Sequence, residues 1–151
     1  VKEIGKETEI FSDENEKGLL ERFWAFVNKN PFAKIVTYNG YKFDVPFLLI
    51  RSHLNNVKIP FRINTNRWNM ESSNHFDVMM FYSQYENFMN ISLEILARLL
   101  NVDAAEPNSI AGADIERYYR EGRIDEIKAK CKRDIELLEE VFKKGCMGYM
   151  K

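Results

Sequence analysis

The chain has 151 residues, of which 45% are hydrophobic and 13% aromatic, so it is long and apolar enough for one domain with a sizeable core. Its formal net charge of -1 excludes a global electrostatic attraction to nucleic acid, and any such binding must come from local patches. No apolar run reaches membrane length, no signal peptide is visible, and the two cysteines lack metal-ligand spacing, which favours a soluble protein of the cytoplasm or another intracellular compartment.

Three elements are predicted in the first part of the chain. Residues 1–11 interleave Ile and Thr with Lys and Glu, which predicts an exposed strand. Residues from about 15 to 28 carry one broad apolar stripe at helical spacing and predict a helix. Residues 33–38 are rich in β-branched and aromatic side chains with apolar groups on both faces, which predicts an interior strand.

The residues after this strand are the most informative part of the chain. Asn39-Gly40 is typical of a turn, in which Gly40 can take a positive φ, and Asp44 can then cap a helix that begins near Val45 and Pro46. One interpretation is an ordinary strand, turn and capped helix. The other is a functional site, because α/β enzymes place their chemistry at the ends of parallel strands.

The second half of the chain continues the alternation. Residues 76–81 predict a short strand or the end of one, with helix as the alternative, and apolar faces predict helices at 93–100 and 135–142. The resulting βαβαβα order with extra helices indicates an α/β fold with a parallel core.

The string Asn39-Gly40, Phe43-Asp44, Pro46-Phe47 and Arg51 resembles the second exonuclease motif of family B DNA polymerases. A second block follows in the family's order and spacing, namely residues 75–79, 92–100, 112–115, 119–127 and 131–137. Over about residues 10 to 144 the chain is similar to the predicted 3′–5′ exonucleases related to the polymerase B proofreading domain. This resemblance implies the ribonuclease-H-like (DnaQ-like) exonuclease fold, a mixed sheet flanked by helices, in one domain over residues 1–151.

The resemblance also implies a metal site. Exonucleases of this superfamily hold two divalent cations, Mg²⁺ or Mn²⁺, with four carboxylates from three motifs. Asp44 is then the second-motif ligand and Asp134 the third-motif ligand, both catalytic. The tyrosine subclass has a water-orienting Tyr at the catalytic position that Lys130 holds here, and a lysine at that place could instead neutralise Asp134.

The first exonuclease motif, an Asp-X-Glu on the opening central strand, has no convincing counterpart. Glu7-Thr8-Glu9 has the spacing but lacks apolar flanks and is expected to be solvent-facing charge. Without that strand the predicted strand at 33–38 would have an unpaired edge. We therefore expect that the sequence begins inside a longer polypeptide and is incomplete at its N-terminus, or that a partner chain supplies the strand; natural loss of the strand is the alternative.

The segment between Asp44 and Glu71 contains no acidic residue but several cations and aromatics. Cations neutralise phosphates and aromatic rings stack on unpaired bases, so the segment favours contact with single-stranded DNA or RNA, and a solvated loop with buried aromatics is the alternative. Together with the second motif, it gives six candidate nucleic-acid-binding residues: Asn39, Phe43, Arg51, Arg62, Arg67 and Trp68. His75 and His53 are expected to be structural or phosphate-contacting, and Asp77 a hydrogen-bond acceptor behind the ligands.

The expected function is that of a 3′–5′ exonuclease-like domain that hydrolyses single-stranded 3′ ends with two metals, as in DNA repair. A catalytically inactive module that binds nucleic acid or a protein is the competing hypothesis, favoured by the absent first motif and by Lys130. A purely structural part of a multidomain polymerase or repair protein is a third.

Overall fold

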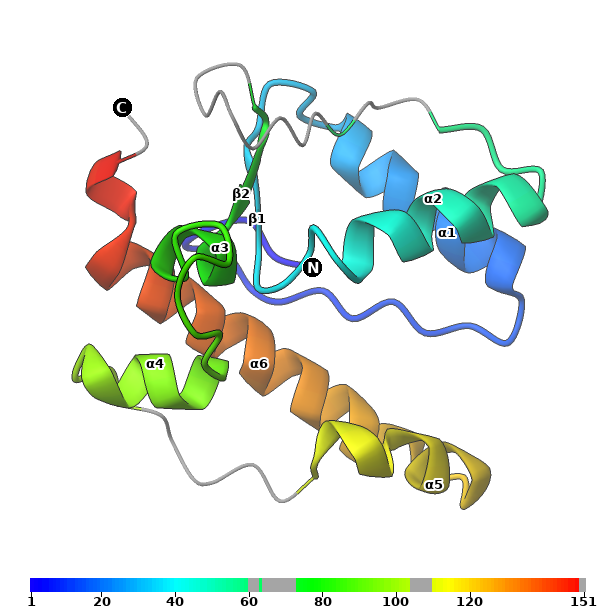
Figure 1. Ribbon diagram of the computed structural model, residues 1–151. Coiled ribbons are helices and arrows are strands. Elements are labelled where there is room, and N and C mark those ends of the chain that lie inside the picture. The colour runs from blue at the N-terminus through cyan, green and yellow to red at the C-terminus, as the bar shows by residue number, and fades with distance from the viewer. Residues whose placement is uncertain (60–62, 64–72, 104–109, 150–151) are drawn as a thin grey trace. The chain divides into compact units, whose positions relative to one another are not determined.

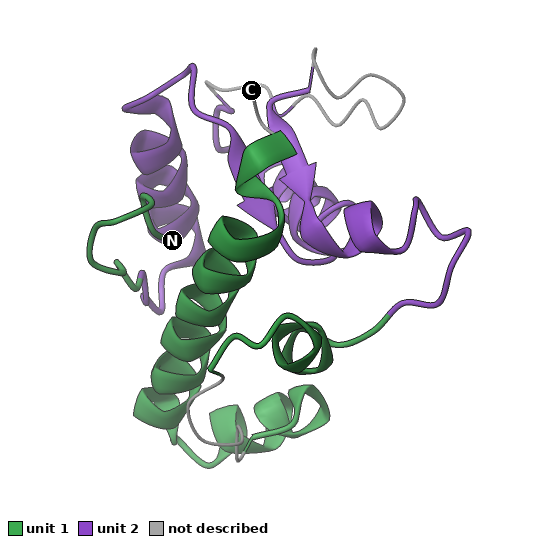
Figure 2. Ribbon diagram, turned by 90° about the vertical axis from the view of Figure 1, so that its left-hand side faces the viewer, with its two compact units in different colours: residues 1–10, 91–151 green, residues 11–90 purple. Residues whose placement is uncertain are grey.

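The computed structural model describes residues 1–59, 63, 73–103 and 110–149. Over these ranges the chain is a mixed α/β protein with six α-helices and a two-stranded parallel sheet (Figure 1). It forms two compact units (Figure 2), which we name the sheet unit, residues 11–90, and the helical unit, residues 1–10 and 91–151. None of the described helices is long and apolar enough to span a membrane.

The sheet unit contains α1 (Glu16–Asn28), β1 (Ile35–Thr37), α2 (Asp44–Leu54), β2 (His75–Asp77) and α3 (Val78–Tyr82). The helical unit contains α4 (Leu93–Leu99), the 3₁₀ helix η1 (Gly112–Asp114), α5 (Ile115–Arg120), α6 (Ile124–Gly145) and a second 3₁₀ helix, η2 (Met147–Tyr149).

The two strands β1 and β2 run parallel, with Ile35 opposite His75 and Thr37 opposite Asp77. The predicted strand at 33–38 and the parallel pairing are therefore confirmed. For residues 76–81 both alternatives hold in part, because β2 ends at Asp77 and α3 begins at the next residue. No third strand is found in the described ranges, and the ribonuclease-H-like fold stays a prediction.

The core of the sheet unit lies where α1 packs against α2. Leu20, Trp24 and Val57 are buried together, which confirms the apolar stripe predicted on the first helix. The buried indole of Trp24 donates from Nε1 to Ser52 Oγ at 2.8 Å, and this hydroxyl donates to the carbonyl of Leu48 at 2.7 Å. The polar atom of the largest core side chain is thus satisfied within the helix pair.

The exposed strand predicted for residues 1–11 is wrong. Gly5 takes a φ of +79° and the chain turns there, so that the backbones of Val1 and Glu9 pair with each other at 2.9 Å. Alternating apolar and charged residues suggested a strand, but here the charges lie around a turn that glycine permits. Glu7 and Glu9 are exposed, as expected for solvent-facing charge.

In the helical unit, α4 and α5 both pack on α6, the longest helix (Figure 1). The helix predicted at 93–100 is confirmed, and the one predicted at 135–142 is the C-terminal part of the much longer α6. Val141 and Phe142 of α6 are buried, as are Leu96 and Ala97 of α4, and they form the interior of this unit. The apolar face predicted on α4 is confirmed only in part, because Leu99 is 69% exposed.

Glu139 fastens the N-terminal segment to α6. Its carboxylate accepts from the backbone N–H of Gly5 at 2.7 Å and pairs with Lys2 at 2.5 Å and Lys143 at 2.8 Å, while its side chain is only 6% exposed. Burial alone would raise the pKa of this carboxyl, but the hydrogen bonds from Lys143, Lys2 and Gly5 outweigh it and lower the pKa to about 2.

We predict that Glu139→Gln lowers the free energy of unfolding at pH 7 by about 1–3 kcal/mol, measured by urea denaturation, because Lys2 and Lys143 lose their charged partner and one of the two acceptor oxygens is replaced by a donor. The native pKa of about 2 lies below the ordinary value of 4.5, so this stabilisation is complete above pH 4.5 and is lost as the pH falls towards 2. The matched control is Glu140→Gln, an exposed neighbour that also pairs with Lys143. Equal losses in the two variants would contradict the assigned role of Glu139.

Candidate functional site

The second-motif loop, residues 38–43, joins β1 to α2 at the carboxyl end of the parallel strands. The backbone carbonyl of Asn39 accepts from the N–H of Lys42 at 3.2 Å and of Phe43 at 3.1 Å. The backbone carbonyl of Gly40 accepts from the N–H of Val45 at 3.0 Å. These bonds link the turn directly to the first turn of α2. The end of a parallel strand is the position where α/β proteins build their sites.

The backbone strain in this loop falls on Asn39, not on Gly40. Asn39 takes a φ of +64°, whereas the sequence suggested that Gly40 would supply the positive φ. Asparagine tolerates this left-handed region better than most residues. Glycine is required at position 40 for another reason, since a Cβ there would lie 2.2 Å from Thr37 Oγ1.

A buried histidine supports the loop from β2. His75 Nε2 and Thr37 Oγ1 share a hydrogen bond of 2.7 Å, and the imidazole lies 4.6 Å from the ring of Tyr41, centroid to centroid. His75 is 3% exposed and its Nδ1 has no hydrogen-bond partner in the structure. Burial lowers the pKa of His75, although the charge of Asp77 acts in the opposite direction. These contacts support the structural role expected for this histidine.

Asp77, two residues later on the same face of β2, holds four backbone N–H groups. Its Oδ1 accepts from Asn39 at 3.0 Å, Met79 at 3.0 Å and Met80 at 3.2 Å, and its Oδ2 accepts from Tyr41 at 2.9 Å. The residue is 3% exposed. One carboxylate therefore caps α3 and also fixes the second-motif loop, which fits the acceptor role expected from the sequence.

Asp44 is the first residue of α2. The expectation that its side chain caps the helix is wrong, because the cap position belongs to Phe43 and no side chain there makes a capping bond. Asp44 is exposed, and no described cation pairs with its carboxylate. Partial removal from water raises the pKa of Asp44, as does the charge of Asp77, while the backbone N–H of Asp44 itself acts the other way.

Two aromatic rings lie beside this carboxylate in the sequence and are open to solvent. Phe43 is 64% exposed and Phe47 is 53% exposed, and their rings stack at 6.0 Å with an interplanar angle of 9°. Large exposed aromatic faces next to a carboxylate are compatible with contact to an unpaired base.

Arg51, another expected nucleic-acid contact, is less open than Phe43. Arg51 is engaged, since its guanidinium binds both carboxylate oxygens of Glu16, which also accepts from Asn55 at 3.1 Å. This bidentate pair links α2 to α1. The same pair of N–H groups of Arg51 is therefore not available for bidentate binding of a phosphate. Three further candidates, Arg62, Arg67 and Trp68, lie outside the described residues, and their role stays a prediction.

On α6, Lys130 Nζ lies 2.6 Å from Asp134 Oδ2, one helical turn away. The Lys130 side chain is only 13% exposed and that of Asp134 is 40% exposed. The neutralisation considered from the sequence is thus present. Neighbouring lysines are also paired, Lys128 with Asp125 at 3.5 Å and Lys132 with Glu136 at 3.9 Å.

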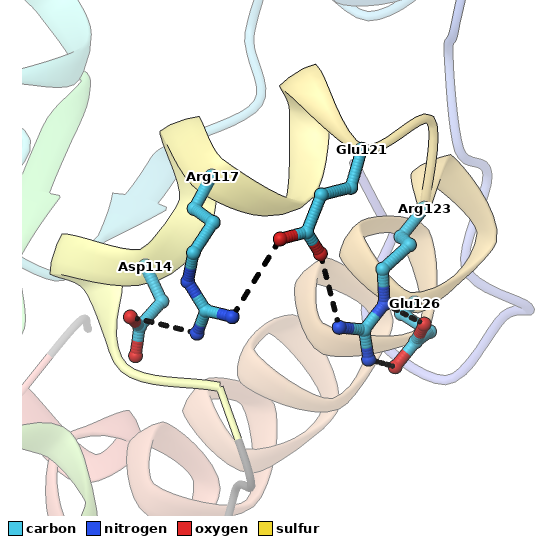
Figure 3. Close-up of polar contacts among 5 residues, drawn as sticks. All are labelled: Asp114, Arg117, Glu121, Arg123 and Glu126. Carbon is cyan, nitrogen blue, oxygen red and sulfur yellow. Dashed lines mark hydrogen bonds and ion pairs between the residues drawn. The ribbon is translucent and has the colours of Figure 1, made fainter.

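The corner between α5 and α6 is a chain of ion pairs (Figure 3). Arg117 bridges Asp114 at 3.0 Å and Glu121 at 3.8 Å, and Arg123 continues from Glu121 at 3.3 Å. Arg123 also binds both oxygens of Glu126, at 2.5 and 2.7 Å, which is the main cause of its raised pKa, and its guanidinium lies 3.8 Å from the ring centroid of Tyr118. The arginines at this corner are therefore paired with carboxylates, which supports a structural role for this segment of the family resemblance.

Within either unit, the described residues form no group of three or more His, Cys, Asp or Glu side chains that could hold a metal ion. Asp44 belongs to the sheet unit and Asp134 to the helical unit, so their convergence on shared cations stays a prediction. As described, the donors do not fit a two-cation site, because Asp44 is a single carboxylate and Asp134 is already paired with Lys130.

The buried, unpaired Nδ1 of His75 predicts a pH dependence of stability. The native pKa lies below the ordinary 6.5, so protonation favours the unfolded chain, and the contribution of His75 is complete above pH 6.5 and declines as the pH falls. The free energy of unfolding should fall between pH 8 and 5.5 with a slope of at most about 1.4 kcal/mol per pH unit. Chemical denaturation of His75→Phe should give a flatter profile than the wild type. Parallel profiles for the two proteins would refute the assignment.

Comparison with known protein families gives one result. Residues 1–137 match the model of a family described as predicted 3'-5' exonuclease related to the exonuclease domain of PolB. No curated protein and no solved structure matches the chain. The match confirms the resemblance seen in the sequence and covers nearly the whole chain. The chain belongs to the family of predicted 3′-5′ exonucleases related to the PolB exonuclease domain.

Proposed function

We propose that this chain is an exonuclease-like domain of ribonuclease-H-like fold that binds single-stranded 3′ ends of nucleic acid and removes nucleotides from them in the 3′–5′ direction. The observation that carries the proposal is the second-motif loop, which presents the exposed carboxylate of Asp44 beside the exposed ring of Phe43. Family membership supports the exonuclease class.

Nucleic-acid contact through this loop follows from its chemistry. The ring of Phe43 is open to stacking, which binds unpaired bases of any sequence. The side-chain oxygen of Asn39 on the same loop is buried and has no hydrogen-bond partner in the structure, so we assign Asn39 a lesser part. Arg51 can join a phosphate only by leaving Glu16, so we assign it the lesser part. The partner we propose is therefore a single strand of DNA or RNA whose last base lies on Phe43.

Exonucleases of this family generally use divalent metals, which activate water and stabilise the leaving oxygen of a phosphodiester. We propose Asp44 and Asp134 as the residues that contact Mg²⁺ or Mn²⁺. Asp44 suits this role, because it is exposed and has no cationic partner among the described residues. Asp134 suits this role only when Lys130 moves away from its carboxylate, so we expect weak metal binding while the Lys130–Asp134 ion pair is in place.

A second candidate function has its own observation. The ion pair between Lys130 and Asp134 places a cation of the chain on the carboxylate that the reaction requires, which favours a catalytically inactive module that retains binding of single strands. The two candidates agree on binding and differ only in turnover.

The binding claim is tested by fluorescence anisotropy with a labelled single-stranded oligothymidylate. We expect Phe43→Ala to weaken binding by about 5- to 100-fold, because stacking on one aromatic ring contributes about 1–3 kcal/mol per base. Phe88→Ala is the matched control, since Phe88 is 68% exposed in the same unit but lies outside the loop. Binding that is unchanged in Phe43→Ala would contradict the proposal.

Turnover is tested with a 3′-labelled single strand and Mn²⁺. The exonuclease hypothesis predicts release of labelled mononucleotide by the wild type and loss of release in Asp44→Asn without loss of binding. Binding without release in the wild type would favour the inactive module.

The ion pair makes a further prediction about metal. Lys130→Met should raise the affinity of the chain for Mn²⁺ by at least about fivefold in calorimetry, because removal of a unit charge about 4 Å away is worth about 1 kcal/mol even in bulk water and the Lys130 side chain is only 13% exposed. Lys132→Met, which removes an exposed lysine paired with Glu136 on the same helix, should leave the affinity unchanged. Equal effects of the two variants would mean that Lys130 does not compete for the Asp134 carboxylate.

A further inference from the structure

The geometry points to Asp77 as the positioning residue of this site: we propose that its carboxylate holds the second-motif loop in the conformation that presents Phe43 and the adjoining Asp44 to a single strand. The importance of this role for nucleic acid rests on the proposed function, whereas the loop conformation can be tested without it.

The bonds of Asp77 divide into two sets. The N–H groups of Met79 and Met80 belong to the first turn of α3, and the carboxylate caps that helix as an Asp commonly does. The N–H groups of Asn39 and Tyr41 belong to the second-motif loop, which is 36 to 38 residues away in the sequence. The second set is not needed to cap α3; it fixes the loop and helps to satisfy the buried carboxylate.

The loop needs such an anchor, because its conformation is strained. Asn39 has a φ of +64°, a region that costs free energy for any residue with a side chain. The bond from its N–H to Asp77 opposes relaxation of this residue towards negative φ. From Asn39 the constraint passes through its carbonyl, which accepts from Phe43 at 3.1 Å, into the start of α2.

His75 assists from the same face of β2 but cannot replace Asp77. It contacts the Thr37 hydroxyl at the end of β1 and the ring of Tyr41, and neither contact holds a backbone donor of the loop. Asp77 is the described side chain that accepts from the Asn39 and Tyr41 N–H groups at 3.0 and 2.9 Å.

A serine at position 77 separates the two sets of bonds. Serine caps helices well, as Ser92 does on α4 by accepting from Ile95, but its hydroxyl is one bond shorter than a carboxylate and should not reach the loop. In the full-length chain, we expect hydrogen exchange followed by NMR to show protection of the Asn39 and Tyr41 amides falling by about tenfold in Asp77→Ser. Protection of the Met79 and Met80 amides should stay within about threefold of wild type, because a cap remains.

Binding of a single-stranded oligothymidylate tests whether the position of the loop matters for nucleic-acid binding. Asp77→Ser should weaken it by about tenfold, since the loop no longer holds Phe43 in place. Ser92→Ala is the control for loss of a helix cap, because it removes a cap in the other unit and leaves the loop bonds intact. If the NMR spectrum showed that Asp77→Ser is unfolded, the same measurements would be made on Asp77→Asn. The asparagine side chain keeps the shape of the aspartate, but only one of its two terminal atoms can accept a hydrogen bond.

Two results would overturn the proposal. One is unchanged protection of the Asn39 and Tyr41 amides in the folded variant. The other is an equal loss of oligonucleotide binding in Ser92→Ala, since stability alone would then explain the effect. If the wild type bound no oligonucleotide, the proposed function would fail, while hydrogen exchange would still decide whether Asp77 positions the loop.

Discussion

The carboxylate of Asp77 is the interaction on which the candidate site depends. It is almost fully buried at the end of β2 and is satisfied by four backbone N–H groups. A buried charge is tolerated only when its acceptor capacity is filled, so strand, loop and helix α3 must meet at this point. These bonds attach the second-motif loop to the parallel strand pair and restrict its motion. The exposed Asp44, which follows the loop directly, is held in place with it.

Ion pairs engage cations in both units. Arg123 pairs with Glu126 and Lys130 with Asp134 in the helical unit, and Arg51 pairs with Glu16 in the sheet unit. Cations engaged in this way are less able to neutralise phosphates. In the sheet unit the loop instead offers an aromatic face and an unpaired carboxylate. Stacking therefore carries more of the proposed recognition than electrostatic attraction does.

The sequence was a good guide where local chemistry decides structure. The run of β-branched residues forms β1, as its composition predicts, and the apolar stripe on α1 is buried, as its helical spacing predicts. The sequence was a poor guide where contacts between residues distant in the chain decide the local structure. Gly40 was expected to supply a positive φ, but its role comes from contact with Thr37 and the strain lies on Asn39. The pairing of Arg51 with Glu16 likewise joins residues 35 positions apart, which no local pattern reveals.

The most direct test of this account is photo-crosslinking of a single-stranded oligonucleotide that carries 4-thiothymidine at its 3′ end, with the crosslinked peptide identified by mass spectrometry. We expect the terminal base to attach within residues 39–43, because the exposed ring of Phe43 and the loop held by Asp77 form the proposed 3′-end site. Attachment confined to the ion-paired corner of α5 and α6, with none in the loop, would contradict it.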